Sequence, residues 1–301
     1  MSRKTVLKTL RYFVAGVLLL LVAAVGVVYG GSTYRLNRKH VVNVRQIPVP
    51  NDAASIERGR HIATTRGCME CHGSDLGGAK VIDDGMAGHI YGPNLTHGVG
   101  GLPTDHSDTD YLRALRHGVA RDGRPLVLMP SHEYTTMSDE DTSSLISYLK
   151  TVPAVDRPRG PVAPGPIVRM LILAGEFKLG AEEIDHNAVQ IASVTPAVSA
   201  DYGKYLVSSC IGCHGINMSG GKIPGAPPDW PTAANLTSHP STNVSHWDEK
   251  QFLAALRTQQ RPDGTKLNPI MPAAFGLMTD LELKALWAYI RTLPSSELGG
   301  R

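Results

Sequence analysis

The sequence predicts a mainly helical protein in which two tandem copies of one domain follow an N-terminal membrane-spanning helix. Three observations predict this: an apolar run near the N-terminus, an internal repeat at an offset of 141–142 residues, and a proline-rich stretch between the two copies. A length of 301 residues and a hydrophobic fraction of 42% suffice for two packed cores. We expect four segments: a membrane anchor with a basic stem (1–45), a first domain (46–153), a linker (154–199) and a second domain (200–301).

The first 45 residues contain the predicted membrane anchor. Residues 13–29 are uncharged and almost entirely apolar, and Tyr12 with Gly30 and Gly31 extends the run to about 20 residues, the length of a transmembrane helix. The run is longer than the apolar region of a signal peptide, and no clear small-x-small cleavage site follows it. These features favour an uncleaved anchor, with a cleaved secretory signal as the alternative. Four basic residues on each side leave the orientation undecided by charge.

Charge is distributed unevenly along the chain. Residues 1–45 hold eight Lys or Arg and no Asp or Glu, whereas residues 46–301 hold 22 basic and 27 acidic residues, a net charge of −5. A mildly acidic body argues against a general nucleic-acid binder, so we expect no nucleic-acid partner.

Each repeat copy is expected to contain three main helices separated by long loops, with few strands. The expected first helices cover 53–66 and 200–209, the middle helices cover 108–118 and 247–258, and the last helices begin at Ser138 and Thr279. Thr279 with Glu282 forms a capping box, and Ser138 with Asp141 approximates one. The motifs that recur in both copies are Cys-x-x-Cys-His, Asn-Leu-Thr, Asp-Gly and Met-Pro.

The linker between the copies begins as an extended, proline-rich segment at 158–166. Residues 167–174 are apolar apart from Arg169 and are too few to cross a membrane. We expect this short segment to pack against the domains, with contact at the bilayer surface as the alternative.

All four cysteines lie in two Cys-x-x-Cys-His motifs, which match the attachment motif for c-type haem. Two thiols three positions apart reach the two vinyl groups of one porphyrin, and the next histidine lies under the iron. We therefore predict two covalently attached haem c groups, each with iron. The residues that would attach the porphyrins and supply the proximal ligands are Cys68, Cys71 and His72, and Cys210, Cys213 and His214.

Other chemistry for the cysteine pairs is less consistent with the sequence. A shared zinc site would join Cys71 to Cys210, which lie in different copies and far apart in the sequence, and would leave the trailing histidines unexplained. A thioredoxin-like redox pair needs a βαβ setting that the sequence lacks. A disulfide between Cys68 and Cys71 would be short and strained.

The second axial ligand is expected to be a methionine in each copy. Met129 follows His72 at the same sequence distance as Met271 follows His214, and each methionine precedes a proline in a loop between helices. Met137 and Met278 also recur, but each precedes a helix cap, where an apolar contact accounts for it. Three histidines remain alternative ligands, and with His117 they form an unexplained group in the first copy: His89, His97 and His106.

Histidine and thioether together would fill both axial positions of the iron and raise its reduction potential. Such a site passes electrons and offers no position for a substrate. The expected function is therefore electron transfer without catalysis by this chain. The alternative is a di-haem enzyme of the peroxidase or thiosulfate dehydrogenase type, which would need one replaceable ligand.

Both copies resemble class I cytochrome c domains, over about 50–153 and 199–296. The resemblance implies that the Pro93 carbonyl accepts a hydrogen bond from His72, a role for which the second copy offers Ala234. It also implies a glycine–aromatic contact between the first and last helices of each domain. The pairs concerned are Gly59 with Tyr148 and Gly203 with Tyr289.

More narrowly, the repeated motifs resemble the cytochrome subunits of membrane-bound alcohol and gluconate dehydrogenases, which carry three haem domains where this chain has two. The resemblance implies a dehydrogenase subunit or quinol-oxidising complex as electron donor, and an oxidase or soluble cytochrome as acceptor. Because haem is attached to exported protein, it also implies a single-pass protein of the bacterial cytoplasmic membrane, with the N-terminus inside and the haem domains in the periplasm.

Overall fold

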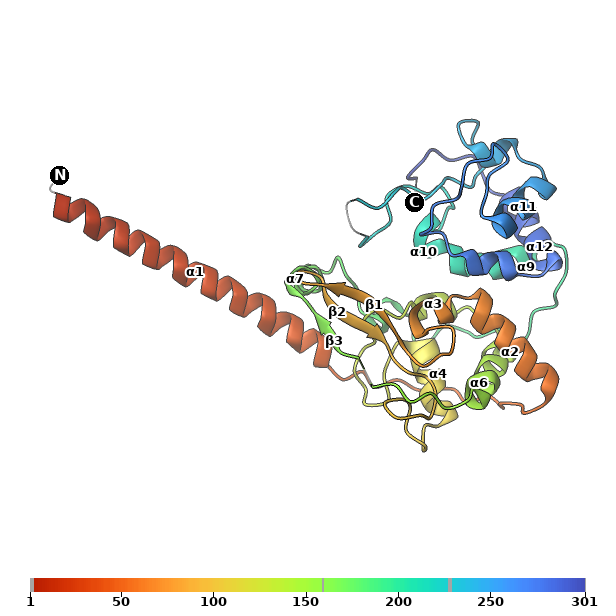
Figure 1. Cartoon of the computed structure of the whole chain (residues 1–301), viewed down its shortest axis with the longest axis horizontal. Helices are drawn as coiled ribbons and strands as arrows, with labels where there is room; N and C mark the ends of the chain where they lie inside the picture. The colour runs from red at the N-terminus through yellow and green to blue at the C-terminus, as the bar shows by residue number, and fades with distance from the viewer. Residues whose placement is uncertain (1–2, 159, 227–228, 301) are drawn as a thin grey trace.

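The computed structural model describes residues 3–158, 160–226 and 229–300. A long helix, α1 (Arg3–Asn37), extends away from two helical bodies that lie one above the other (Figure 1). The first body follows α1 directly, and the second contains the C-terminus. The prediction of a mainly helical chain with one N-terminal apolar helix and two repeated domains is confirmed.

Helix α1 carries the predicted membrane span. Its apolar window is unburied, and within the described residues it is the one helix long and apolar enough to cross a membrane. A signal sequence has the same length and composition, so this finding leaves both expectations for the N-terminus open. The helix ends in a basic stem, of which Arg35 belongs to the last turn.

The first domain is built around the packing of α2 (Ala53–Thr65) on α6 (Asp139–Thr151). Along the chain, three helices come between α2 and α6: α3 (Cys68–His72), α4 (Asp108–His117) and α5 (Ser131–Tyr134). Their apolar faces enclose one core that includes Leu112, Leu145 and Ile146, each with no exposed surface. In this domain the helix bounds agree with the expected ones to within one residue, and capping side chains account for the starts of α2, α4 and α6. In the second domain the expected 200–209 ends three residues too late and the expected 247–258 begins two residues too early.

The second domain repeats this plan. Helix α9 (Ala200–Leu206) packs on α12 (Asp280–Ile290), as α2 packs on α6. The other elements are α11 (Glu249–Thr258), the four-residue helix α10 (Ile211–His214) and three 3₁₀ turns, η1 (Val207–Cys210), η2 (Asn243–His246) and η3 (Ala273–Leu277). The capping box predicted at Thr279 and Glu282 is present.

A three-stranded antiparallel sheet in the first domain was missed by the sequence analysis, which found little strand signal. Strand β2 (Gly88–Gly92) pairs with β1 (Ala79–Asp84) on one side and with β3 (Val162–Pro164) on the other. Strand β3 comes from the expected linker, far beyond β2 in the sequence. Its pairing depends on long-range contact, which local periodicity cannot indicate.

Two more helices form where the linker was expected, α7 (Pro166–Ala174) and α8 (Gly180–Glu183). Val168 and Ile172 of α7 are buried with Leu179 in a small core of their own. Ala87 and Val127 of the first domain pack against that core. The expected packing of residues 167–174 therefore occurs against the first domain.

The first and last helices of each domain approach closely at a glycine, as the resemblance implied. A Cβ atom at Gly59 would overlap the carbonyl oxygen of Ser144 and lie 2.7 Å from Cβ of Tyr148. In the second domain, a Cβ atom at Gly203 would overlap the carbonyl oxygen of Ala285 and lie 2.7 Å from Cβ of Tyr289. Each pair of helices can pack at this distance only because glycine has no side chain.

We predict that Gly59→Ala lowers the free energy of unfolding by about 1–3 kcal/mol, because the added methyl group must push α2 away from α6. Gly85→Ala is the matched control, since its Cβ would meet nothing within 4 Å and its φ is ordinary. Denaturant unfolding of the two variants beside the unmodified protein measures the difference. Equal loss in both variants would contradict the close-packing explanation.

Candidate haem sites and the contact between them

The two Cys-x-x-Cys-His motifs occupy equivalent places in the two domains. Cys68, Cys71 and His72 lie on α3, which is bounded by Gly67 and Gly73, both at positive φ. Cys210, Cys213 and His214 lie on the turn from η1 into α10. All four cysteine side chains are partly buried, and no disulfide joins any of them. Each motif thus presents two thiols and an imidazole on a single short turn.

Both motif histidines are oriented by the same backbone hydrogen bond. Nδ1 of His72 lies 2.8 Å from the Pro93 carbonyl oxygen, and Nδ1 of His214 lies 2.7 Å from the Ala234 carbonyl oxygen. A carbonyl only accepts, so Nδ1 carries the proton and Nε2 is the nitrogen with a lone pair for a metal. Burial lowers the pKa of His72 and so favours the neutral ring, although the hydrogen bond to Pro93 has the opposite effect. The second domain has Ala234 where the first has Pro93, and the orienting carbonyl is present in both.

The buried thiols lack the low pKa that a redox pair or a zinc-binding pair needs. Burial raises the pKa of Cys68 and of Cys210 to about 12. A protonated, buried thiol is a weak nucleophile and a weak zinc ligand. Across the described residues, no three His, Cys, Asp or Glu side chains are placed to hold a metal ion together.

The methionines differ in burial in the way that a ligand and a core residue would. Met137 and Met278 are each 1% exposed inside the domain cores. Met129 and Met271 are only partly buried, in the loops before α5 and η3. Met129 packs against the same core as Cys68, and Met271 against the same core as Cys210. Each domain therefore brings one thiol of its motif and a thioether to the same core. With the second thiol and the oriented imidazole on the same turn, this donor set fits haem c.

The repeated Asn-Leu-Thr motif holds the carbonyl that orients each histidine, a role that its recurrence alone did not reveal. Nδ2 of Asn94 donates to the Val155 carbonyl and Nδ2 of Asn235 donates to the Ser296 carbonyl, both at 2.7 Å. These bonds join the loop after the haem motif to the chain beyond the last helix. Pro93 and Ala234 directly precede the two asparagines, so their carbonyl positions are fixed.

The unexplained group of four histidines does not form one site. His89 pairs with Asp83 at 2.6 Å, and His97 lies 3.3 Å from the Leu102 carbonyl oxygen. His106 packs edge-on against Tyr111. Nδ1 of His117 lies 3.1 Å from Nδ1 of His186, and burial lowers the pKa of His117 to about 4. These contacts bind the first domain and the linker locally.

Comparison with known proteins agrees with this geometry. The cytochrome c family profile matches residues 56–153 and 200–294, which together are more than half of the chain. The chain belongs to the cytochrome c family. The resemblance drawn from the repeated motifs is thereby confirmed, and both matched segments contain one complete haem motif.

Several curated relatives are cytochrome subunits of dehydrogenases. The chain is 28% identical to the fructose dehydrogenase cytochrome subunit of Gluconobacter japonicus, over 86% of this chain and 58% of the relative. It is 31% identical to the gluconate 2-dehydrogenase cytochrome c subunit of Pantoea cypripedii, over 77% of this chain and 55% of the relative. It is 27% identical to the cytochrome c subunit of the quinone-dependent alcohol dehydrogenase of Gluconobacter oxydans, over 81% of this chain and 56% of the relative. The chain thus spans just over half the length of these relatives.

The two cytochrome c domains are joined by a buried arginine that the sequence analysis did not single out. Arg66 is 6% exposed and lies two residues before Cys68. Its Nη1 lies 3.0 Å from the Leu206 carbonyl oxygen and 2.9 Å from the hydroxyl oxygens of Ser208 and Ser209, directly before Cys210. Its own carbonyl accepts a hydrogen bond of 3.0 Å from Tyr134. One residue therefore contacts the segments that lead into both haem motifs.

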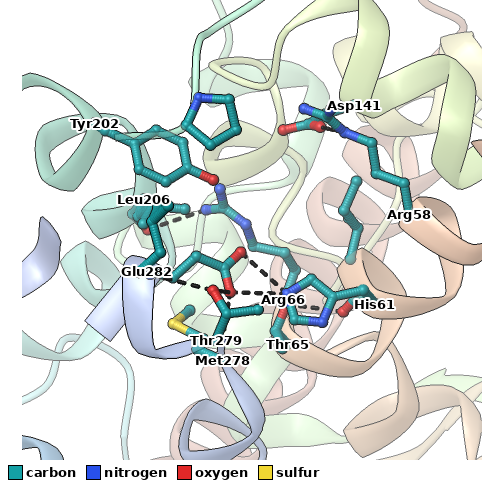
Figure 2. Close-up of a pocket in the computed structure, with 13 residues that line it drawn as sticks. Arg58, His61, Thr65, Arg66, Asp141, Tyr202, Leu206, Met278, Thr279 and Glu282 are labelled. Atoms are coloured by element: carbon teal, nitrogen blue, oxygen red, sulfur yellow. Dashed lines mark hydrogen bonds and ion pairs between the residues drawn. The ribbon is translucent and has the colours of Figure 1, made fainter. Parts of the chain in front are cut away.

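A second set of contacts surrounds a cavity of about 220 Å³ between the domains, lined by α2, α6, α9 and α12 (Figure 2). Nε2 of His61 lies 2.8 Å from the Glu282 carboxylate, which also accepts from Thr279. The Tyr205 hydroxyl donates to Asp141, so a residue of each domain again pairs with one of the other.

Glu133 of α5 in the first domain lies against Gly212, which is part of the second haem motif and directly precedes Cys213. A Cβ atom at Gly212 would lie 2.5 Å from Oε1 of Glu133. Burial raises the pKa of Glu133 to about 7, against the lowering effects of Arg66 and of a hydrogen bond from the Gly212 backbone. In Figure 1, α3 and α10 lie on the facing sides of the two domains, as these contacts require. The two haem motifs thus lie on either side of one shared interface.

We predict that Arg66→Ala separates the unfolding of the two domains and lowers the free energy of unfolding by about 2–4 kcal/mol, because three buried acceptors lose a charged donor. Calorimetry of the intact chain should show two resolved transitions in the variant. Arg60→Ala is the control, because Arg60 is exposed and pairs with Glu57 on its own helix. An unchanged single transition in Arg66→Ala would show that this side chain does not hold the domains together.

We predict that docking of the domains weakens as pH rises above 6.5, because the hydrogen bond to Glu282 raises the pKa of His61 above 6.5 despite the opposing effect of burial. The folded state then binds this proton more tightly than the unfolded chain, so the stabilisation is complete below pH 6.5 and disappears as pH rises through the raised pKa. The denaturation midpoint should fall less between about pH 6 and pH 9 in His61→Gln than in the unmodified protein. His246→Gln, at an exposed position, should keep the original slope.

Proposed function

We propose that this chain is a membrane-anchored di-haem cytochrome c that carries electrons from a dehydrogenase or quinol-oxidising partner toward a terminal acceptor. The observation that supports this most directly is the duplicated donor set. In each domain a Cys-x-x-Cys-His turn has its histidine oriented through Nδ1 by a carbonyl, and a methionine at the same sequence distance beyond that histidine packs beside the same core.

The roles follow from the chemistry of each side chain. Cys68 and Cys71 would attach one haem c and Cys210 and Cys213 the other, through thioether bonds. His72 and His214 would ligate iron through Nε2, and Met129 and Met271 would fill the opposite positions. A bound haem c supplies a one-electron couple, and a thioether ligand opposite imidazole raises its potential. The carbonyl of Pro93 would tune that couple by fixing the orientation of His72.

With both axial positions filled by protein, neither site would leave room for a substrate. The relatives are named as cytochrome subunits, and we assign the same type of role to this chain: it would receive and release electrons while a partner subunit does the chemistry. The contact through Arg66 supports transfer between the domains, because it fixes the two motifs at one interface.

The proposed location is the cytoplasmic membrane of a bacterium. Helix α1 would cross the bilayer once, with the N-terminus inside and both cytochrome domains in the periplasm, where haem is attached to exported protein. The relatives include subunits of fructose, gluconate and alcohol dehydrogenases, so we propose a dehydrogenase of this type as donor and an oxidase or soluble cytochrome as acceptor.

We predict that the purified protein contains two c-type haems, both low-spin, with the charge-transfer absorption of methionine-ligated iron. In Met129→Leu about half of that absorption should disappear and one haem should become high-spin and bind carbon monoxide. Pyridine haemochrome analysis would count the haems, and optical and paramagnetic resonance spectra would report the ligands.

Met137→Leu is the matched control, because Met137 is buried in the same core and directly precedes a helix cap. It should keep both low-spin signals, and Met271→Leu with Met278→Leu repeats the comparison in the second domain. A high-spin or carbon monoxide-binding haem in the unmodified protein would contradict the ligand assignment. That result would favour the di-haem enzyme instead.

A further inference from the structure

Helix α7 is apolar on the face that it exposes as well as on the face that it buries. Val168 and Ile172 are 6% and 0% exposed, whereas Ile167, Met170 and Leu173 are 41%, 48% and 37% exposed. A surface helix of a water-soluble domain normally turns polar side chains outward. We call Ile167, Met170 and Leu173 the outer face of α7.

The only charged side chain of α7, Arg169, is directed toward α1. Nη1 of Arg169 lies 3.0 Å from the hydroxyl oxygens of both Ser32 and Thr33, and its guanidinium lies 4.8 Å from the centre of the Tyr29 ring. From α1, Arg35 donates to the Ile172 carbonyl and to Glu182. These contacts attach α7 to the last turns of the long helix.

The point of attachment is the end of the predicted membrane span. A Cβ atom at Gly31 would lie 2.7 Å from Cδ1 of Leu173, and Gly30 and Gly31 complete the apolar run of α1. In Figure 1, α7 lies at the edge of the first domain, beside the lower turns of α1. Tyrosine and arginine side chains such as Tyr29 and Arg169 are typical of the level where a membrane helix enters the headgroup region.

Two more exposed apolar side chains lie on the sheet and the hairpin next to α7. The backbone N–H of Ile167 donates to the Met86 carbonyl at 3.1 Å, and Met86 is 54% exposed. Val162, at the start of β3, is 47% exposed. Exposed apolar side chains therefore also occur on the hairpin and the strand that precede the outer face.

We propose that the outer face of α7 lies in the boundary between headgroups and acyl chains of the bilayer that α1 crosses. This inference rests on the proposed membrane anchor and adds a second membrane contact to it. Lipid is the occupant that the structure favours, because the patch is joined to the span at Gly31 and lies where the span ends. Helices that lie in the membrane interface bury apolar side chains at the boundary between headgroups and acyl chains. The first cytochrome domain would then be held in a fixed orientation on the membrane.

The test uses the full-length, haem-loaded protein in vesicles of phosphatidylethanolamine and phosphatidylglycerol that contain a lipid with a photoreactive acyl chain. After illumination, mass spectrometry of tryptic peptides reports labelling of residues 12–35 in α1 and of residues 170–178, which begin with Met170 of α7. We expect label on both peptides. In Met170→Glu/Leu173→Glu, label on 170–178 should fall about tenfold while label on α1 stays unchanged, because carboxylates leave the acyl region.

The outcomes separate this inference from the proposed function. Label on α1 alone overturns the α7 contact and leaves the anchor intact. Label on neither peptide overturns the anchor and the α7 contact together. Val189→Glu is the control, because Val189 is 95% exposed on the same linker and outside the patch. An unchanged haem spectrum in every variant would show that the fold is intact.

Discussion

The buried contact of Arg66 with the second domain is the interaction on which the arrangement of the two haem motifs depends. Its guanidinium lies among three oxygen atoms just before Cys210, and its backbone directly precedes the turn that carries Cys68. A buried charge is tolerated only where its hydrogen bonds are satisfied, and the domains supply those bonds only when docked. His61 with Glu282 and Tyr205 with Asp141 extend the same interface. The two domains therefore form one unit rather than two bodies on a flexible linker.

What could be predicted from the sequence is what is encoded locally or by repetition. The helix starts at Ser138 and Thr279 were predictable because a capping side chain and its partner lie three residues apart. The Cys-x-x-Cys-His turns and the close approach at Gly59 were predictable from their duplication and from the family resemblance. Two contacts were not predictable: the pairing of β3 with β2, and the hydrogen bonds from Arg66 to the residues just before the second haem motif. Such contacts join positions whose local sequences carry no signal for one another.

The two copies differ in the segment that follows the haem motif. Among the residues that the structure describes, the second copy has an isolated bridge between Gly221 and Ala233 where the first copy has the β1–β2 hairpin. The hairpin gives β3 an edge to pair with, and β3 leads directly into α7. In the first copy the hairpin thus also holds the linker, and through α7 the end of α1. Both copies retain the carbonyl that orients the motif histidine, although Ala234 replaces proline.

These contacts form a continuous path from the end of α1 to the second haem motif. The outer face and Arg169 join α7 to the end of α1, the sheet joins α7 to the first domain, and Arg66 joins the first domain to the second. Electron tunnelling slows steeply with distance, so an electron carrier gains from parts that cannot drift apart. A cytochrome attached by α1 alone could rotate about its stem and would meet a membrane-bound donor in many orientations. With two membrane contacts and a buried arginine between the domains, the same haem edges would face the same direction at every encounter.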